Sequence, residues 1–485
     1  MCYIKAYEIF YIHIGLPNPI PNFPIRKVAT GQVNFMRYYL FILGCQMNVS
    51  DAERLRTVLN SAKYQETTDE KSADLIVVVA CSVRQTAIDR IHGKINMWKK
   101  WKKFDNDESA LGRKKRNLKI ALTGCVLPAD KKQLAKSFDF IFDVKEMEKL
   151  PEMLSSNSKQ GAANKKNKSY LKIKPNQQSK FSAQVPIMTG CDNFCTYCAV
   201  PFTRGREVSR PAKEIVAEVK DLIKNNYKDI TLLGQNVNSY KPNFINLVEK
   251  LDKIPGSHWI RFTSNHPKDF SLDLIKFLKT SKHFAKYIHL PVQSGSDKIL
   301  KAMKRPYKIA DYIKLAQKIR KEIPARNASR SDAGGPGVCL TTDVIVGFPG
   351  ETKKDFEKSC ELFRKIKYDL AYISQYSPRP GTPAAKLKDN VPRAEKKRRE
   401  LFLNSILSRS ALENNQKLVN KKIKVLVEKL SSDKSYVLAR TSTLKTVKIF
   451  HFHHMEKVEY AEKLTPGQFA KIKITSATAW KLEGK

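Results

Sequence analysis

The chain has little acidic character and no long hydrophobic run. Among its 485 residues, 47 are Asp or Glu and 89 are Lys or Arg, for a formal net charge of +42 at pH 7. There is no run of about 18 apolar residues, so we expect no membrane-spanning helix. Residues 1–35 lack the features of a signal peptide, and we interpret them as a loose extension or a mis-assigned start. These absences predict a cytoplasmic protein with no membrane partner.

The positive excess indicates a polyanionic partner. RNA fits, because each phosphate that a Lys or Arg neutralises releases counterions. A coat of solvated Lys side chains, set by codon usage alone, would give the same composition. Charge by itself therefore leaves both interpretations open.

Three of the nine cysteines lie within eight residues: Cys191, Cys195 and Cys198. An odd number of cysteines with no secretion signal favours metal ligation over disulfides. Three thiolates at this C-x3-C-x2-C spacing hold three corners of a 4Fe–4S cube and leave one iron open for a substrate. A zinc knuckle or a disulfide pair are the alternatives, but zinc needs a fourth ligand and the next His along the chain is His258.

Residues 36–153 alternate strand and helix signals, which predicts a small parallel α/β domain. The expected strands are 38–43, 74–79 and 118–122. A cysteine follows each of them, just before a helix begins: Cys45, Cys81 and Cys125. Because parallel strands present their carboxyl ends at one edge of a sheet, we expect these three cysteines to form a second cluster site.

Residues 154–180 are rich in Lys, Ser, Asn and Gln, and we interpret them as a basic linker that cannot bury a core. Residues 181–415 repeat a strand–helix pattern that predicts a partial (β/α)6 barrel with a trailing amphipathic helix over 386–415. The expected strands are 185–191, 229–234, 259–263, 287–291, 340–347 and 370–376. The expected apolar stripe of the trailing helix is Leu401, Leu403, Ile406 and Leu407.

Polar clusters follow all six expected barrel strands, which predicts one pocket at the carboxyl edge. Among them, Gln235, Asn236 and Gln293 are candidates for hydrogen bonds to a bound ligand. Arg204, Arg206 and Arg210 are candidates for contacts to a carboxylate or a phosphate, although structural ion pairs are an equal alternative. Cys339 and Cys360 lie outside the motifs and are expected to be buried apolar packing.

Residues 416–482 show short alternating strands that predict a compact antiparallel barrel, a class that often binds nucleic acid. Four cations in this region are expected to contact phosphates: Arg440, Lys445, Lys448 and Lys471.

Several sequence blocks occur in one order along the chain. They are Gly44-Cys-Gln-Met-Asn48, the stretch 190–205 around the cysteine triplet, Ser209-Arg-Pro211, Leu233-Gly-Gln-Asn-Val-Asn238, His289-Leu-Pro-Val-Gln-Ser-Gly-Ser296 and Val346-Gly-Phe-Pro-Gly-Glu351. From about Met36 the chain resembles the radical S-adenosylmethionine (SAM) methylthiotransferases, and its last domain looks like a TRAM domain. The Gly-Cys-Gln-Met-Asn block is typical of the tRNA 2-methylthio-isopentenyladenosine synthases, the MiaB group.

The resemblance implies two 4Fe–4S clusters and SAM as cofactors. It assigns Cys191, Cys195 and Cys198 to the SAM-cleaving cluster and the three N-terminal cysteines to an auxiliary cluster that supplies sulfur. With SAM as the ligand, the candidates for its contacts are Gln235, Asn236, Gln293 and Arg204. The resemblance also implies a tRNA anticodon loop as substrate, with an electron donor such as flavodoxin or ferredoxin, and we expect a monomer.

Two features depart from the family pattern. Val79-Ala80 stands before Cys81 where relatives carry Asn-Thr, and 325–337 enlarges a connection that is short in relatives. We interpret the enlargement as surface, with RNA contact as the alternative. Two other functions remain open: methylthiolation of threonylcarbamoyl-adenosine or of a ribosomal protein, and RNA binding by a non-catalytic iron–sulfur protein.

Overall fold

The structure is a computed structural model that describes residues 35–83, 85–103, 118–156, 169–324, 337–433, 435–450 and 464–485. The predictions for residues 1–34 and for 325–336 fall outside the described residues.

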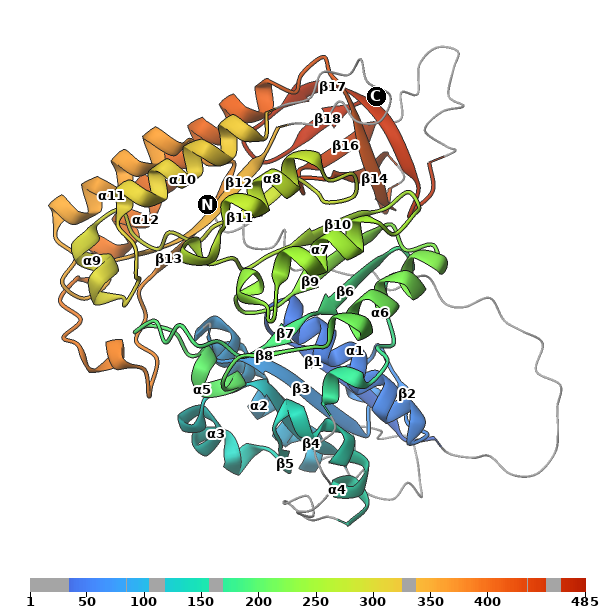
Figure 1. Ribbon diagram of the computed structural model, residues 1–485. Helices are drawn as coiled ribbons and strands as arrows, with labels where there is room; N and C mark the ends of the chain where they lie inside the picture. Colours follow the sequence, from blue (N-terminus) through green and yellow to red (C-terminus); the bar gives the residue numbers. More distant parts are fainter. Residues whose placement is uncertain are drawn as a thin grey trace. The chain divides into compact units, whose positions relative to one another are not determined.

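The N-terminal domain is a parallel sheet in the order β2-β1-β3-β4-β5 (Figure 1). Its strands are β1 (Arg37–Ile42), β2 (Gln65–Glu66), β3 (Leu75–Cys81), β4 (Lys119–Cys125) and β5 (Phe140–Ile141). Its helices are α1 (Gln46–Ser61), α2 (Gln85–Lys103), α3 (Pro128–Leu134) and α4 (Leu150–Ser156). Alternate residues of β3 pack into two cores, one with α1 and α4 and the other with α2 and α3, so the strand is buried on both faces.

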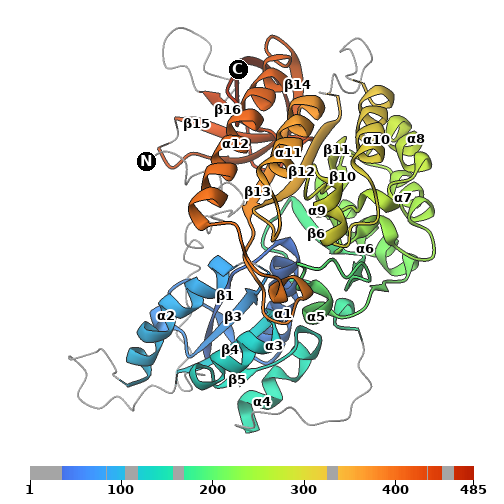
Figure 2. The ribbon, with the colours of Figure 1, turned by 90° about the vertical axis from the view of Figure 1, so that its left-hand side faces the viewer.

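The central domain has six parallel strands with helices outside them (Figure 2). The strands are β6 (Ser182–Pro186), β9 (Asp229–Leu233), β10 (Trp259–Phe262), β11 (Tyr287–His289), β12 (Cys339–Val346) and β13 (Leu370–Gln375). The helices are α5 (Val200–Arg204), α6 (Ala212–Lys224), α7 (Phe244–Asp252), α8 (Leu272–Thr280), α9 (Asp297–Ala302), α10 (Ile309–Glu322) and α11 (Lys353–Ile366). Strands β6, β9 and β10 form one sheet and β11, β12 and β13 another, with a parallel bridge between Ile260 and Phe284. The predicted partial barrel is confirmed.

The first barrel strand is shorter than predicted. It ends at Pro186, and a short antiparallel pair follows, β7 (Met188–Thr189) with β8 (Val208–Ser209). This pair brackets the stretch that carries the cysteine triplet, so Cys191 lies on a loop rather than on the strand.

The C-terminal part is a closed barrel in the order β14-β15-β16-β18-β17. Its strands are β14 (Lys422–Leu430), β15 (Tyr436–Thr441), β16 (Thr446–Phe450), β17 (Phe469–Ala477) and β18 (Leu482–Gly484). The preceding helix is α12 (Arg393–Gln416), which begins seven residues later than predicted. Leu403 and Leu407 are buried as expected, but Leu401 is 43% exposed, so its place in the apolar stripe was wrong.

The predicted linker is also partly wrong. Tyr170 and Leu171 are buried in the core that α1 and α4 share with the sheet. The Lys-rich composition did not reveal these side chains or Leu154, which lies in the same core, because the average polarity of a segment says nothing about single buried residues. Cys339 and Cys360 are buried, as predicted.

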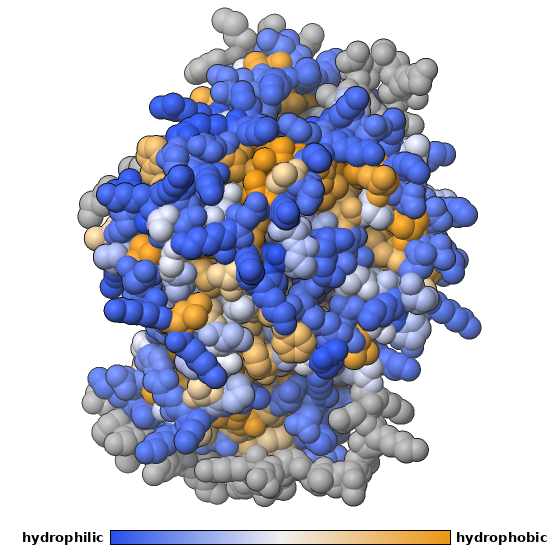
Figure 3. Space-filling view, turned by 60° about the vertical axis from the view of Figure 1, so that its left-hand side comes forward, coloured by the Kyte–Doolittle hydropathy of each residue, from blue (hydrophilic) through white to orange (hydrophobic). Residues whose placement is uncertain are grey.

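No helix within the described ranges is both long and apolar enough to cross a membrane. On the face drawn in Figure 3, hydrophilic side chains predominate and apolar ones form patches between them.

Candidate active site

The three N-terminal cysteines converge at one edge of the sheet. Cys81 and Cys125 are the last residues of β3 and β4 and pair across the ladder, while Cys45 is the N-cap of α1 after β1. A hydrogen bond with Cys81, together with burial, raises the pKa of Cys125 well above its usual value. Cys45 is an exposed residue, and the desolvation of its sulfur by surrounding protein atoms, followed by the nearby Cys125, raises its pKa. The three thiols therefore lie near one another at this edge, and their role as ligands of a second cluster stays a prediction.

Two glycines that precede cysteines have backbone that other residues rarely adopt. Gly124 has φ +106°, and a Cβ there would lie 2.3 Å from the Ala80 carbonyl oxygen. Gly190 has φ +79°, and a Cβ there would lie 2.0 Å from the Arg206 carbonyl oxygen. Glycine is thus required next to Cys125 and next to Cys191 for the chain to pass this close.

The barrel cysteines lie on the loop between β7 and β8. The backbone N–H of Cys191 donates to the Gly205 carbonyl at 3.2 Å, which closes the loop on itself. Burial, with smaller contributions from Cys195 and Cys191, raises the pKa of Cys198 to about 12. Ligand thiols must lose their protons when iron binds, so cluster assembly is expected to release protons here.

Thr196, between the second and third cysteines, fixes the loop to the barrel. Its N–H donates to Met303 O at 3.1 Å, and its carbonyl accepts from the Ala384 N–H at 2.9 Å. Its hydroxyl donates to Ala302 O at 2.9 Å. The position of the triplet is therefore set by the helix after β11 and by the segment after β13, far away in sequence.

Beyond the cysteines, several buried polar atoms at the carboxyl ends of β9 and β10 have no hydrogen-bond partner among the described residues. They are Gln235 Oε1, Asn236 Oδ1, Asn265 Oδ1 and His266 Nε2. Buried polar atoms are normally paired, so these are free to bond a ligand. Beside them lies a cavity of about 310 Å³ whose lining includes Asp192, Asn236 and Asp269.

Of the three predicted SAM contacts from the barrel mouth, Asn236 is 2% exposed and its Nδ2 donates to Asp269 at 2.8 Å. Gln293 is 7% exposed and has φ +71°, an unusual conformation for a residue other than glycine. Its N–H donates to Asp343 O at 2.8 Å, which holds the loop after β11 against β12. Strain held by its surroundings in this way is frequent at ligand sites.

Arg204 forms a buried ion pair, the structural alternative that the sequence left open. Its Nε donates to Cys125 Sγ at 2.8 Å and its two Nη atoms reach Asp51 at 3.3 and 2.5 Å, in a setting where the arginine is 1% exposed. Nη1 also donates to the Tyr170 hydroxyl at 3.1 Å. Among the described residues, this guanidinium therefore contacts Cys125, Asp51 and Tyr170.

The two other arginines of this region have different surroundings. Arg206 has a side chain that is 74% exposed, with Asp192 at 2.8 Å and the Phe194 ring 5.4 Å away. Arg210 is buried and bonds Pro186 O at 2.7 Å and Glu218 at 2.8 Å, which is the structural alternative.

A second contact joins the barrel to the N-terminal cysteines. Arg379, on the loop after β13, donates to Gln85 Oε1 at 2.5 Å at the start of α2. Burial lowers the pKa of Arg379, and Cys81 is among the nearby groups that oppose this shift. Loops after the first and the last barrel strands thus both reach the cysteine edge of the N-terminal sheet.

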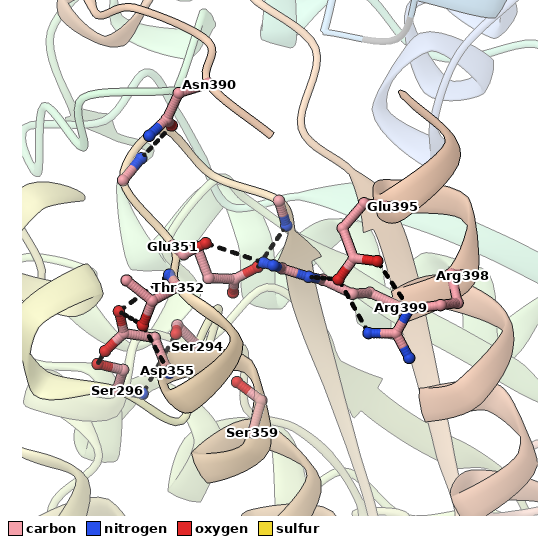
Figure 4. A network of polar contacts seen from close by, with 12 residues as sticks. Ser294, Ser296, Glu351, Thr352, Asp355, Ser359, Asn390, Glu395, Arg398 and Arg399 are labelled. Atoms are coloured by element: carbon pink, nitrogen blue, oxygen red, sulfur yellow. Dashed lines mark hydrogen bonds and ion pairs between the residues drawn. The ribbon is translucent and has the colours of Figure 1, made fainter. Parts of the chain in front are cut away.

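The family motifs after β11 and β12 prove to be supports for the barrel mouth (Figure 4). Glu351 Oε2 accepts from the Gly347 N–H at 2.6 Å and from Arg399 of α12 at 2.6 Å. Ser296 donates to Asp355 of α11 at 2.7 Å. These bonds fix the two loops to the outer helices.

Two of the four predicted phosphate contacts form ion pairs within the protein. Lys445 is paired with Asp369 at 3.0 Å and donates to Asn415 at 2.7 Å. Arg440 pairs with Glu428 at 2.6 Å and with Asp229 at 3.4 Å. Lys448 lies 4.2 Å from the Tyr436 ring, and Lys471 is exposed, so the surface role remains open for these two.

Three known protein families match successive parts of the chain, in the order of its three domains. Residues 37–143 match the Uncharacterized protein family UPF0004, residues 185–363 match the Radical SAM superfamily, and residues 416–485 match the TRAM domain.

Curated relatives match nearly the whole chain. The tRNA-2-methylthio-N(6)-dimethylallyladenosine synthase of Carboxydothermus hydrogenoformans is 38% identical over 92% of this chain and 98% of the relative. The synthase of the same name from Clostridium tetani is 37% identical over 92% of this chain and 96% of the relative. The one from Bacillus anthracis is 35% identical over 97% and 88%. The chain belongs to the radical SAM tRNA methylthiotransferases.

A solved structure supports the fold of the enzyme. The radical S-adenosylmethionine methyltransferase TsrM from Kitasatospora setae, with cobalamin and a [4Fe-4S] cluster bound, has a TM-score of 0.51 at 12% identity. The match covers 72% of this chain and 77% of that one.

The residues present fit the SAM and 4Fe–4S cluster that the family implies. Three sulfurs lie on one closed loop, and the unpartnered amide and imidazole atoms at the barrel mouth offer bonds to a polar ligand. Among the described residues, no three His, Cys, Asp or Glu side chains are placed to hold a single metal ion. The ligand sulfurs of a 4Fe–4S cube lie farther apart than the ligands of a single metal ion, because each thiolate binds a different iron.

Sequence reasoning missed Asp51 and Arg305 as members of the site, although Arg305 Nη1 lies 3.7 Å from Cys195 Sγ. Asn265, His266 and Arg379 belong to polar clusters that the sequence placed at the barrel mouth, but no role was predicted for their side chains. For Asp51 and Arg305 the signal was only their place beside a motif, which does not say where a side chain points.

Proposed function

We propose that this methylthiotransferase converts N6-isopentenyladenosine, the dimethylallyladenosine of its relatives' names, into the 2-methylthio derivative at the position next to the anticodon. The observation that carries the proposal is the pair of three-cysteine sets, joined by Arg204 at the end of α5, six positions after Cys198. The relatives named for this product match almost their entire length, and the Gly44–Asn48 block of their group is intact.

Cys191, Cys195 and Cys198 hold the 4Fe–4S cluster which, with SAM, supplies a 5′-deoxyadenosyl radical. Gln235, Asn236 and Gln293 orient SAM by hydrogen bonds from the barrel mouth. Cys45, Cys81 and Cys125 hold a second 4Fe–4S cluster that carries the sulfur. Two SAM molecules serve each product, one as methyl donor and one as radical source.

The sulfur site, the SAM site and the tRNA surface belong to successive domains of the chain. Residues 36–153 carry the sulfur site, 181–415 the SAM site, and 416–482 the surface for tRNA, with 154–180 between the first two. The enzyme works as a monomer in the cytoplasm with a flavodoxin or ferredoxin as electron donor. Arg206 and Lys471 are exposed cations suited to phosphate, whose contacts position the RNA rather than select its sequence.

The test separates the two cysteine sets. The Cys45→Ala protein, loaded with iron and sulfide, reduced and given SAM with isopentenylated tRNA, should still form 5′-deoxyadenosine but no methylthio product. The Cys195→Ala protein should form neither. If Cys45→Ala stopped the cleavage of SAM as completely as Cys195→Ala does, the division into two sites would fail.

A further inference from the structure

Each cysteine set has one buried arginine that donates to one of its sulfurs. Arg204 Nε lies 2.8 Å from Cys125 Sγ, and Arg305 Nη1 lies 3.7 Å from Cys195 Sγ. The two arginines are 1% and 7% exposed. They come from different elements, the end of α5 and the turn after α9, so the arrangement is not a repeat of one local motif.

The two arginines differ in their counter-charge. Arg204 is paired with the buried Asp51 at 2.5 Å. Arg305 donates to the Pro291 carbonyl at 2.6 Å and to the Tyr307 hydroxyl at 3.0 Å. Within the described part of the chain, Arg305 forms no ion pair with a carboxylate.

A buried guanidinium without an anion costs several kcal/mol, at about the scale of a broken buried ion pair. The group that faces Arg305 is the cysteine loop, whose three thiolates carry negative charge when iron is bound. Arg305 is also 5.2 Å from the centre of the Tyr307 ring, which fixes the plane of the guanidinium. The negative charge of the iron-bound cysteine thiolates therefore supplies the counter-charge that Arg305 lacks.

Hydrogen bonds to ligand sulfurs and nearby positive charge both raise a cluster's reduction potential, because reduction adds negative charge to the cluster. A cation that is already neutralised acts mainly through its hydrogen bond, whereas an unpaired one acts through its field as well.

We propose that Arg204 and Arg305 are positioning residues that orient one cysteine of each cluster, and that their unequal counter-charges give the two clusters different reduction potentials. Arg305, free of a carboxylate, raises the potential of the cluster at Cys191, Cys195 and Cys198. Asp51 cancels most of the field of Arg204, so the cluster at the N-terminal cysteines stays harder to reduce. The statement about Arg204 rests on the proposed function, which includes the second cluster, whereas the statement about Arg305 does not need that cluster.

The experiment is a redox titration followed by electron paramagnetic resonance on the full chain. Each cluster is isolated by replacing the three cysteines of the other set with alanine. With the barrel cluster alone, Arg305→Met should lower the ratio of reduced to oxidised cluster about tenfold at fixed potential, which is ~59 mV for one electron. Arg305→Lys keeps the charge and should recover most of that ratio. With the N-terminal cluster alone, Asp51→Asn should raise the ratio by a similar factor.

Iron content and melting temperature are measured on every variant, so a folding defect is seen directly. A shift below twofold in both Arg305→Met and Asp51→Asn, in protein that holds its iron, would overturn the proposal. Equal shifts in Arg305→Met and Arg305→Lys would also overturn the claim that charge is the cause. If the protein with only Cys45, Cys81 and Cys125 took up no four-iron cluster, the proposed function would fail. The Arg305 titration would still test the effect of Arg305 on the potential of the barrel cluster.

Discussion

The side-chain amide of Asn48 accepts hydrogen bonds from Cys45 through its oxygen and donates one to the neighbouring strand β3 through its nitrogen. Its Oδ1 accepts from the Cys45 N–H at 3.3 Å and from the thiol at 3.4 Å, while Nδ2 donates to the Ala80 carbonyl at 3.1 Å. One buried side chain thus ties the turn after β1 to the end of β3, where Cys81 lies.

Asn48→Ala should reduce iron uptake by the N-terminal set, because the turn that carries Cys45 loses its tie to β3. The lost buried hydrogen bonds should also cost about 1–3 kcal/mol of stability. Iron analysis and denaturant unfolding check both effects. Asn60→Ala is the control, since Asn60 accepts a bond from the Tyr38 hydroxyl at the far end of α1. Equal iron loss in the two variants would contradict the role of Asn48.

Arg399→Met should destabilise the enzyme by about 3–5 kcal/mol, because Glu351 would keep a buried carboxylate without its partner. The adjacent Arg398 has a side chain that is 55% exposed, and among the described residues its ion pair is with Glu395 of the same helix, so Arg398→Met should change stability by about 0.5 kcal/mol or less (Figure 4). The free energies of unfolding of the two variants, measured side by side, test this contrast. Similar losses in both would show that the barrel mouth does not depend on the Glu351 support.

Substitution of Lys445 should affect stability, whereas substitution of Lys471 should affect tRNA binding. Lys445→Met removes one of the two cations paired with the buried Asp369, and because Arg320 stays at 3.4 Å the loss of stability should be about 1.5–3 kcal/mol. Lys471→Met should leave stability within about 0.5 kcal/mol. It should weaken tRNA binding and reduce the slope of log affinity against log salt by about 1. Calorimetry and binding at several salt concentrations separate the two, and an unchanged slope in Lys471→Met would remove Lys471 from the RNA surface.

Gln235→Ala should weaken SAM binding about tenfold, because its buried Oε1 would no longer be available to the ligand. Equilibrium dialysis on iron-loaded protein measures the affinity. Gln317→Ala, on the exposed side of α10, is a matched control with no expected effect. An unchanged affinity in Gln235→Ala would place SAM away from this amide.

The sequence predicted the elements whose signal is local and periodic. Alternating strand and helix runs gave both parallel domains, and the cysteines at strand ends were placed correctly because a parallel sheet has one carboxyl edge. The partners of charged residues were harder to predict. Lys445 lies just before β16, where the sequence indicates a surface cation, but Asp369, with which it pairs, is 76 positions away. Arg204 stands six residues after Cys198, yet its guanidinium bonds the other cysteine set, since the direction of α5 is fixed by tertiary packing.

The most direct test of the account is mass spectrometry of tRNA nucleosides from a bacterial host that lacks its own methylthiotransferase for isopentenyladenosine and expresses this chain. The account predicts that 2-methylthio-isopentenyladenosine appears with the wild-type chain and is absent with Cys45→Ala and with Cys195→Ala. Unchanged isopentenyladenosine in cells that contain folded, iron-loaded wild-type protein would contradict the proposed substrate.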